Sequence, residues 1–427
     1  MKLPEAFIEQ TRNVMGEDRF ARYLAAFDEE PPVSIRLNPK KWKPLPQSVA
    51  EREPSGDAVP WCPLGVYLPS RPTFTFDPLF HAGCYYVQEA ASMFLYEVLR
   101  QQIVNSELSN SKCLDLCAAP GGKSTLLRSL LPDDWVLYSN EPVRQRASIL
   151  LENITKWGGP NCIVTNNYPH DYRKSKLTFD LILCDVPCSG EGMFRRDPQT
   201  ISEWSPQNVE RCWQLQRDIV SDAWHCLRPG GLFIYSTCTF NTKENEENIR
   251  WMLEQFGDAE VVPVETQPEW HITGSLLEGF DQPVYRFIPG ITRSEGLFVC
   301  VFRKAATSHP LPEEESHCTQ GQGSHGRKQG KKQAETQLKV LSASLPDSEE
   351  SAESIPLSFQ QAIAYLRGEA LTLPADAPHG QLSVTFMGHY LGQVKNIGTR
   401  ANNLYPKEWR IKSTYIPKEY EAILRLT

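Results

Sequence analysis

The chain has 427 residues, of which 40% are hydrophobic, and its formal net charge is −8, from 44 Lys and Arg against 52 Asp and Glu. No apolar run approaches the roughly 20 residues that span a bilayer, so a membrane protein is excluded. Twelve cysteines without a Cys-x-x-Cys pair argue against a disulfide scaffold and against a zinc ribbon. We therefore expect reduced thiols, no metal site and a cytoplasmic location.

The first 75 residues are rich in proline and predict a small leading module. Residues 1–10 carry two glutamates and no apolar stretch, so we expect no secretion signal. Further along lie Arg36, Lys40 and Lys41, which are candidates to meet the phosphates of a nucleic acid. The negative overall charge does not exclude such a partner, because an acidic segment elsewhere can hide a local basic surface.

Residues 76–305 predict a doubly wound, Rossmann-like α/β domain. Residues 88–100 show the apolar spacing of one helical face. Short apolar runs then alternate with helical patterns, which is typical of a parallel sheet covered by helices on both faces. The runs expected to form strands are Cys113–Leu116, Trp135–Tyr138, Cys162–Thr165, Phe179–Cys184, Leu232–Tyr235 and Leu297–Phe302.

Composition changes at about residue 306. Residues 306–354 hold few large apolar side chains and many polar ones, so they cannot bury enough surface to fold. We interpret this segment as a flexible linker. Residues 355–427 contain apolar residues again, and they predict a compact, mildly basic module of mixed α/β or β structure.

A strand-to-helix turn at Leu114–Ser124 carries the densest chemical signal. Its small residues let backbone N–H groups approach a ligand at a helix N-terminus, which predicts a nucleotide-like cofactor. A phosphate-binding P-loop needs Gly five residues before Gly122, where this chain has Cys117. Glu141 stands where such folds place the acid that binds ribose hydroxyls. An acid of this kind without a phosphate loop suits S-adenosyl-L-methionine.

Two cysteines and a carboxylate follow the ends of two other strands. Asp185 and Cys188 come after the fourth strand, and Cys238 follows the fifth. Because the ligand crevice of an open α/β sheet lies beyond the carboxyl ends of its strands, we expect all three to face one pocket. Cys113 and Cys184 lie inside strands and fit buried, apolar positions instead.

Several motifs in order resemble the NOP/Sun family of RNA cytosine-C5 methyltransferases. They are Ile35–Pro39, Gln88–Met93, Asp115–Ser124, Asp185–Gly190 and Ser236–Thr239. The resemblance covers about residues 1–305. It implies an RNA-binding role for residues 1–75 and S-adenosyl-L-methionine as the cofactor of a methyltransferase domain over residues 76–305.

The last module resembles the PUA-like RNA-binding tail of the bacterial type F methyltransferases of the small ribosomal subunit. The resemblance rests on Tyr365–Glu369, Leu391–Lys395 and Asn403–Arg410. It implies that the substrate is ribosomal RNA, most simply 16S rRNA within a small-subunit particle. Transfer RNA is the alternative substrate. We expect the protein to be a monomer.

Cytosine C5 is too weakly nucleophilic to attack a methyl sulfonium, so a thiolate must first add to C6. An acid that hydrogen-bonds N3 assists this addition. By resemblance, Cys238 is the nucleophile, Cys188 assists product release, Asp185 contacts the base and Lys123 hydrogen-bonds near Asp185. The residue types alone do not distinguish the roles of the two cysteines.

The resemblance also implies the cofactor-binding residues. They are Cys117, Ala118, Ala119, Pro120, Gly121, Gly122, Lys123, Glu141, Tyr168 and Asp185. Tyr168 stands where the family usually has an Asp near the adenine, so this contact departs from the pattern. Residues 289–292 also lack a His that the family would lead us to expect.

The substrate side offers further basic candidates. Arg195 and Arg196 follow the fourth-strand loop, where they could meet phosphates. In the tail, basic residues interleave with Trp409, which suits RNA, although Trp409 in the module's core is an equal alternative. The basic residues are Lys395, Arg400, Lys407, Arg410 and Lys412.

Two other functions compete with cytosine-C5 methylation. A methyltransferase acting on an exocyclic amino group would carry Pro-Pro and an aromatic residue after the fourth strand, and Val186 and Cys188 do not fit that pattern. A ribosome-assembly protein could keep the fold without catalysis, but all the chemical residues are present. We therefore expect an RNA (cytosine-C5-)-methyltransferase.

Overall fold

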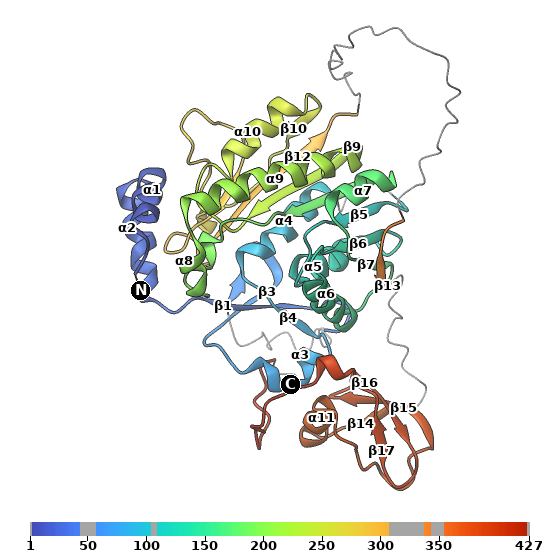
Figure 1. Cartoon of the computed structure of the whole chain (residues 1–427). Coiled ribbons are helices and arrows are strands. Elements are labelled where there is room, and N and C mark those ends of the chain that lie inside the picture. Colours follow the sequence, from blue (N-terminus) through green and yellow to red (C-terminus); the bar gives the residue numbers. More distant parts are fainter. Residues whose placement is uncertain (1, 43–56, 104–108, 307–336, 343–353, 425–427) are drawn as a thin grey trace, which may run out of the picture.

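The computed structural model of the chain describes residues 2–42, 57–103, 109–306, 337–342 and 354–424. A central sheet with helices on both sides dominates it, and the C-terminal module lies at one end (Figure 1). No helix within these ranges is both long enough and apolar enough to cross a membrane.

The central sheet has nine strands in the part of the chain that the structure describes, with the order β10-β12-β9-β8-β5-β6-β7-β13, and β11 pairs with β12. Five strands run parallel, as the sequence predicted: β5 (Lys112–Asp115), β6 (Val136–Asn140), β7 (Cys162–Thr165), β8 (Phe179–Asp185) and β9 (Leu227–Thr237). The others pair antiparallel: β10 (Ala259–Val261), β11 (Tyr285–Phe287), β12 (Leu297–Lys304) and β13 (Val340–Ser342). The sheet is therefore mixed, with antiparallel strands toward both edges.

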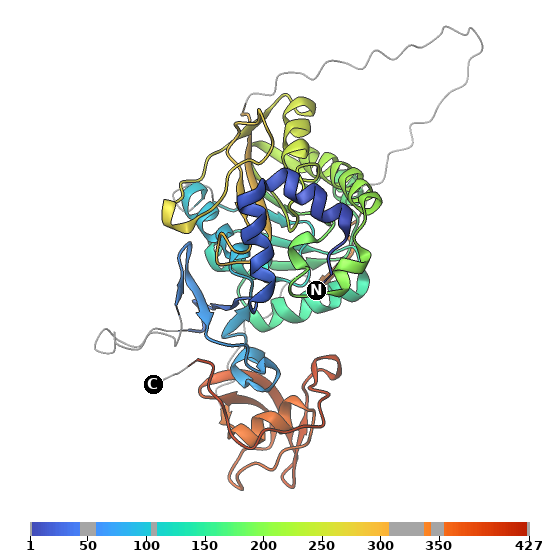
Figure 2. The ribbon, with the colours of Figure 1, turned by 90° about the vertical axis from the view of Figure 1, so that its left-hand side faces the viewer.

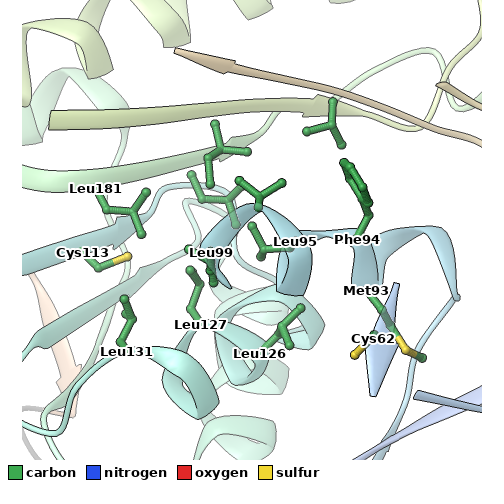
Figure 3. Packing of buried hydrophobic residues seen from close by; sticks show 14 of the residues in the cluster. Cys62, Met93, Phe94, Leu95, Leu99, Cys113, Leu126, Leu127, Leu131 and Leu181 are labelled. Carbon is green, nitrogen blue, oxygen red and sulfur yellow. The ribbon is translucent and has the colours of Figure 1, made fainter. Parts of the chain in front are cut away.

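Alternating side chains of the strands build a separate core on each face. On β8, Leu181 and Leu183 belong to one core, and Ile182 and Cys184 belong to the other. Figure 3 shows Leu181 in the first core. The first core is covered by α4 (Leu95–Gln102), α5 (Gly122–Leu130) and α6 (Arg144–Trp157). The second is covered by α7 (Pro169–Ser175), α9 (Pro206–Cys226) and α10 (Glu246–Gln255). Each large apolar side chain buried in this way stabilises the fold by about 1.5–3 kcal/mol.

The N-terminal residues share their cores with the rest of the chain. Helices α1 (Glu5–Met15) and α2 (Glu17–Ala25) pack against Phe194, Trp204 and Phe240, close to the loops that carry the two cysteines. A small sheet has the order β2-β3-β1-β4, formed by β1 (Val33–Leu37), β2 (Ala58–Val59), β3 (Cys62–Leu68) and β4 (Tyr85–Val87). Because β4 pairs with β1, the boundary expected at residue 75 falls inside this sheet.

The C-terminal module is formed by β14 (Ser354–Pro356), α11 (Phe359–Leu366), β15 (Gly380–Phe386), β16 (His389–Asn396) and β17 (Ala401–Asn403). Its apolar residues join one cluster with those of the small N-terminal sheet and of α3 (Pro78–His81). Figure 2 shows the module directly below this helix. A hydrogen bond from the Tyr420 hydroxyl to Asp77 Oδ1 (3.1 Å) crosses the same interface, so the tail is docked against the N-terminal region.

The segment expected to be a flexible linker contributes to the core sheet. Strand β13 pairs antiparallel with β7, and Lys339 exchanges hydrogen bonds with Asn166 and Asn167. The expectation was therefore wrong for residues 338–342, whereas most of residues 306–354 lie outside the described ranges. Composition missed the strand because three residues of edge pairing carry almost no periodic signal.

The helix predicted over residues 88–100 begins later, as a 3₁₀ turn at Ala91–Phe94 that continues into α4. The remaining short elements are α8 (Gln199–Glu203) and the 3₁₀ turns Ala26–Asp28, Phe74–Phe76, Glu191–Met193, Pro268–Trp270 and Lys407–Trp409.

Candidate active site

A pocket of about 340 Å³ lies at the carboxyl ends of the parallel strands. The strand order reverses between β5 and β8, which is the point where open α/β sheets bind ligands. Asp185 and Cys238 line this pocket, and so do these members of the predicted cofactor set: Cys117, Ala118, Ala119, Pro120, Gly122 and Lys123. Gly121, Glu141, Tyr168 and Cys188 are not among the described residues that line it.

The two cysteine sulfurs contact each other where Cys238 lines the pocket. Cys188 Sγ lies 3.1 Å from Cys238 Sγ, and the backbone N–H of Cys238 donates to Cys188 Sγ (3.3 Å). The hydrogen bond with Cys238, followed by burial, raises the pKa of the Cys188 thiol well above its ordinary value. Cys188 therefore holds its proton more tightly than an ordinary thiol, and Cys238 is the one of the two cysteines that lines the pocket.

Asp185 is held in a fixed orientation at the pocket. Lys123 Nζ donates to Asp185 Oδ2 (2.7 Å), and Ser236 Oγ donates to Asp185 Oδ1 (2.6 Å). Burial lowers the pKa of Lys123, but the ion pair with Asp185 outweighs it, so the pKa of Lys123 is raised. Lys123 therefore stays charged and keeps a fixed positive group beside the carboxylate.

The turn after β5 has the shape that a nucleoside-type ligand needs. Gly121 has a φ of 117°, which favours glycine, and a Cβ at Gly122 would lie 3.3 Å from the Tyr86 ring. Asp115 Oδ1 is buried without a hydrogen bond, and burial raises the pKa of Asp115 to about 7. An unpaired buried oxygen is costly, and a donor on a bound molecule would relieve that cost.

Glu141 is buried at the end of β6, as the sequence placed it. Its Oε1 accepts from the Val143 backbone N–H (2.9 Å), and its Oε2 has no hydrogen bond, with Arg146 at 3.4 Å. A free acceptor here fits ribose hydroxyls. Tyr168 is 60% exposed and stacks on His170, so in this structure the ring packs against a neighbour outside the pocket.

Three of the basic residues proposed for phosphate contact have structural roles instead. Arg36 is fully buried, where its guanidinium donates to Gln88 Oε1 (2.6 Å) and lies over the Trp157 ring. Lys41 Nζ donates to two backbone carbonyls, and burial lowers its pKa to about 8. Arg195 forms a buried ion pair with Glu295 (2.9 Å).

The expectation was therefore wrong for Arg36, Lys41 and Arg195, because sequence cannot tell a solvated basic residue from one that donates to buried carbonyls. Arg196 is exposed and lines the pocket, so it remains a candidate for RNA contact. Lys40 pairs with Asp133 at the surface (2.6 Å). In the tail, Trp409 is half-buried beside Lys156 and packs against the apolar cluster shared with the N-terminal sheet, whereas Lys395, Arg400, Lys407 and Lys412 are exposed.

Sequence reasoning missed two buried carboxylates between the cysteine loops, Glu191 and Glu244. Each accepts a backbone N–H from the opposite loop. Each of them lies a few residues after one of the cysteines, and this position was their signal in the sequence. They were missed because charged residues in such loops are usually exposed to solvent. Within the described residues, no three His, Cys, Asp or Glu side chains come together in a way that fits a metal ion.

Three family models match the chain in order. The model described as the N-terminal domain of 16S rRNA methyltransferase RsmF matches residues 3–90, and the model for 16S rRNA methyltransferase RsmB/F matches residues 102–303. The model for the methyltransferase RsmF PUA domain matches residues 352–411. Together the three matches cover more than half of the chain.

Related proteins and solved structures point to the same family as the three models. Ribosomal RNA small subunit methyltransferase F of Aliivibrio fischeri is 34% identical over 72% of this chain, a match that spans 65% of the relative's length. The protein of that name from Erwinia tasmaniensis is 27% identical, with 95% of this chain and 96% of the relative covered. A methyltransferase homologue from Pyrococcus horikoshii has a TM-score of 0.58 at 27% identity, covering 70% of this chain and 95% of its own. NSun6 from Pyrococcus horikoshii, solved with SFG, shares the fold at 20% identity, with a TM-score of 0.57 over 71% of this chain and 99% of its own. The chain belongs to the RsmB/F family of methyltransferases, in the form that carries an N-terminal domain and a PUA domain.

Proposed function

We propose that this protein methylates C5 of a cytosine in 16S rRNA through a transient covalent bond between Cys238 and C6. The observation that carries the proposal is the pair of sulfurs 3.1 Å apart, with Cys238 lining a pocket that Asp185 also lines. A single nucleophilic thiol would suffice for many reactions. A second thiol at contact distance suits a reaction in which the first bond must also be broken.

The residues divide the chemistry as follows. Cys238 adds to C6 as a thiolate, while Cys188 keeps its own proton. As the thiolate adds, N3 takes up a proton from solvent, and the Asp185 carboxylate, held by Lys123 and Ser236, accepts a hydrogen bond from the resulting N3–H. After methyl transfer the C5 proton leaves to solvent, the C6–sulfur bond breaks to regenerate the Cys238 thiolate, and N3 returns its proton to solvent. Cys188 assists this release by donating a hydrogen bond to the leaving sulfur beside it.

We infer that S-adenosyl-L-methionine is the methyl donor, and it supplies a methyl group bound to a positively charged sulfur. The turn from Cys117 to Lys123 would hold its methionine end, and Glu141 would hold its ribose. The unpaired buried oxygens of Asp115 and Glu141 support this placement. Tyr168 would reach the adenine only if its ring turned away from His170.

The proposed substrate needs a base outside its helical stack, because the sulfurs lie at the end of a crevice. We propose that residues 1–75 and the PUA-like module of residues 355–427 bind the surrounding RNA, with residues 76–305 as the catalytic domain and residues 306–354 as the connection. The curated relatives are named as small-subunit methyltransferases, which favours ribosomal RNA within a small-subunit particle. We expect a cytoplasmic monomer.

The test combines product mapping with cysteine variants. Purified protein is incubated with small subunits or with transfer RNA and a labelled methyl donor, and nucleosides are identified by mass spectrometry. We expect 5-methylcytosine in 16S rRNA, no product with Cys238→Ala, and a covalent protein–RNA adduct that persists with Cys188→Ala. Cys212→Ala, on α9 outside the pocket, is the control and should match the unmodified protein.

Methylation that survives Cys238→Ala would contradict the mechanism. Loss of activity in Cys188→Ala without an adduct would instead assign the nucleophile to Cys188. Product in transfer RNA alone would show that transfer RNA is the substrate. An N4-methylated base would show that the enzyme methylates the exocyclic amino group and not C5.

A further inference from the structure

The loops that carry the two cysteines are joined by a pair of buried carboxylates. The Cys188 loop runs from β8 to the turn at Glu191–Met193, and the Cys238 loop runs from β9 to α10. Neither Glu191 nor Glu244 lines the pocket among its described residues, and neither contacts the reacting atoms in the mechanism above. Both are buried, at 2% and 0% exposure.

Each carboxylate reaches across to the opposite loop. Glu244, on the Cys238 loop, accepts from the backbone N–H of Ser189 (3.0 Å), the residue after Cys188. Glu191, on the Cys188 loop, accepts from the backbone N–H groups of Phe240 (2.7 Å) and Asn241 (3.0 Å), just after Cys238. The exchange is reciprocal, so neither loop can move without breaking a bond to the other.

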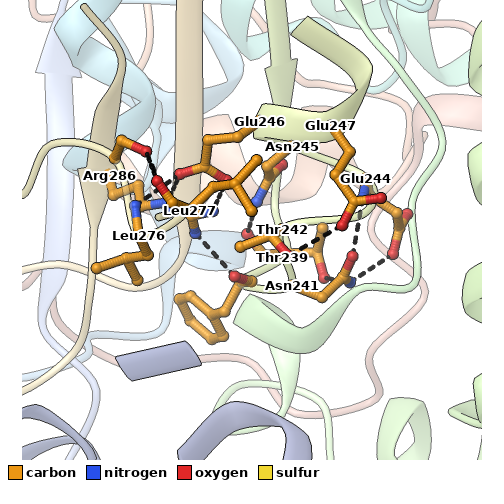
Figure 4. A network of polar contacts seen from close by, with 12 residues as sticks. Thr239, Asn241, Thr242, Glu244, Asn245, Glu246, Glu247, Leu276, Leu277 and Arg286 are labelled. Carbon is orange, nitrogen blue, oxygen red and sulfur yellow. Dashed lines mark hydrogen bonds and ion pairs between the residues drawn. The ribbon is translucent and has the colours of Figure 1, made fainter. Parts of the chain in front are cut away.

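Side chains complete the connection. The Asn241 amide donates to Glu191 Oε1 (3.0 Å) and to Glu244 Oε1 (2.8 Å), and Figure 4 shows its bond to Glu244. Gln216 of α9 donates both to Glu244 Oε2 (2.7 Å) and to the Pro187 carbonyl (2.9 Å). The amide of Asn241 thus lies between two carboxylates, and Gln216 fixes one of them to the Cys188 loop.

We propose that Glu191 and Glu244 are positioning residues that hold Cys188 and Cys238 at the spacing that a two-thiol reaction needs. Glu244 fixes the loop of Cys188, and Glu191 fixes the loop of Cys238. This inference rests on the proposed function. Burial, followed by the charge of Glu191, raises the pKa of Glu244 to about 7, which is the cost of placing two carboxylates together in this interior.

The geometry predicts different defects for the two residues. In Glu244→Gln, one carboxylate oxygen becomes an NH₂ group that faces the donors of Ser189, Gln216 or Asn241, so the loop of Cys188 shifts. Product release should slow at least tenfold while the first methyl transfer changes by less than twofold, and the covalent adduct should accumulate. In Glu191→Gln, the loop of Cys238 shifts, so adduct formation itself should slow at least tenfold and no adduct should accumulate.

A readout that needs no catalysis separates positioning from general damage. Diamide, a thiol oxidant, converts two neighbouring thiols to a disulfide and is itself reduced to the hydrazine. Peptide mapping should detect a Cys188–Cys238 disulfide that forms at least tenfold more slowly in both variants than in the unmodified protein. Glu247→Gln, which changes a partly exposed glutamate next to the same network, should match the unmodified protein in every assay.

Equal disulfide rates in all four proteins would overturn the proposal. So would an unchanged ratio of single-turnover to steady-state rates in both variants. Thermal melting and binding of S-adenosylhomocysteine will show whether Glu191→Gln folds. If it does not, Glu191→Asp takes its place, because it keeps the charge but shortens the side chain. This variant must then form both the covalent adduct and the disulfide more slowly. Absence of 5-methylcytosine with the unmodified protein would reject the proposed function instead, and the disulfide rates would still test the positioning.

Discussion

The buried ion pair of Arg286 and Glu246 gives a quantitative test of how the Cys238 loop is anchored. Arg286 and Glu246 are 1% and 0% exposed, and Arg286 binds both oxygens of Glu246 (Figure 4). Arg286 Nη1 also donates to the carbonyl of Phe240 (2.8 Å), two residues after Cys238. Arg286→Met leaves the Glu246 carboxylate in the interior with the Leu276 N–H (3.0 Å) as its remaining partner.

Removing one partner of a buried ion pair typically costs about 3–5 kcal/mol, because the other charge stays unpaired. We expect this loss in the free energy of unfolding, measured by urea denaturation with tryptophan fluorescence. Replacing both partners removes the unpaired charge, so Arg286→Met with Glu246→Gln should regain more than half of the loss. The surface pair of Lys40 and Asp133 is the comparison, and Lys40→Ala should cost less than about 1 kcal/mol.

Two results would refute this reasoning. In the first, Arg286→Met costs no more than Lys40→Ala, which would mean that the pair contributes no more than a solvated one. In the second, the double variant is no more stable than Arg286→Met, which would mean that the loss comes from packing and not from an unpaired carboxylate.

Three further outcomes are expected. Burial raises the pKa of Asp115 to about 7, so as pH rises from about 4 to about 7 the unfolded chain loses this proton before the folded protein does, and the free energy of unfolding falls. Asp115→Asn should therefore raise the melting temperature more at pH 8 than at pH 5. The same variant should bind the methyl donor more weakly in calorimetry. Lys123→Met frees Asp185 from its ion pair and should slow single-turnover methylation about 100-fold with RNA affinity unchanged in filter binding; an equal loss in RNA affinity would contradict it. Arg196→Ala should reduce the slope of log affinity against log salt by about 1. Lys41→Met, at a half-buried lysine that donates to two backbone carbonyls, should leave this slope unchanged.

The fold could be predicted from sequence wherever a strand is buried on both faces. The runs around Leu114, Ile182 and Phe233 are apolar at successive positions because both sides of the sheet are covered, and all three form parallel strands. The antiparallel direction of β12 could not be read, because its apolar run looks the same in either direction. Strand β13 is too short for its pattern to stand out.

The sequence could predict those site residues whose place in the fold depends only on their position after a strand. Asp185, Cys188 and Cys238 meet because the strands before them pair side by side. Burial of charged residues was not predictable, since Arg36 differs from a surface arginine only through partners such as Gln88, far away in the sequence. The carboxylate of Glu244 escaped notice for the same reason.

Strand register brings the two sulfurs near each other, and the loops then set the final spacing. In the parallel pair of β8 and β9, Asp185 stands opposite Ser236, so Cys188 and Cys238 lie three and two residues beyond paired positions. Neighbouring strands run about 4.8 Å apart, and a slip of one residue moves a side chain by about 3.3 Å and turns it to the other face. Pairing alone thus places both cysteines at the same edge within a few ångströms, but the two strands end at residues 185 and 237. Beyond them, single backbone hydrogen bonds join the two segments, from the Val186 N–H to the Ser236 carbonyl (3.0 Å) and from the Gly192 N–H to the Cys238 carbonyl (2.8 Å). The remaining distance depends on bonds between the loops, and the two buried carboxylates accept several of these bonds.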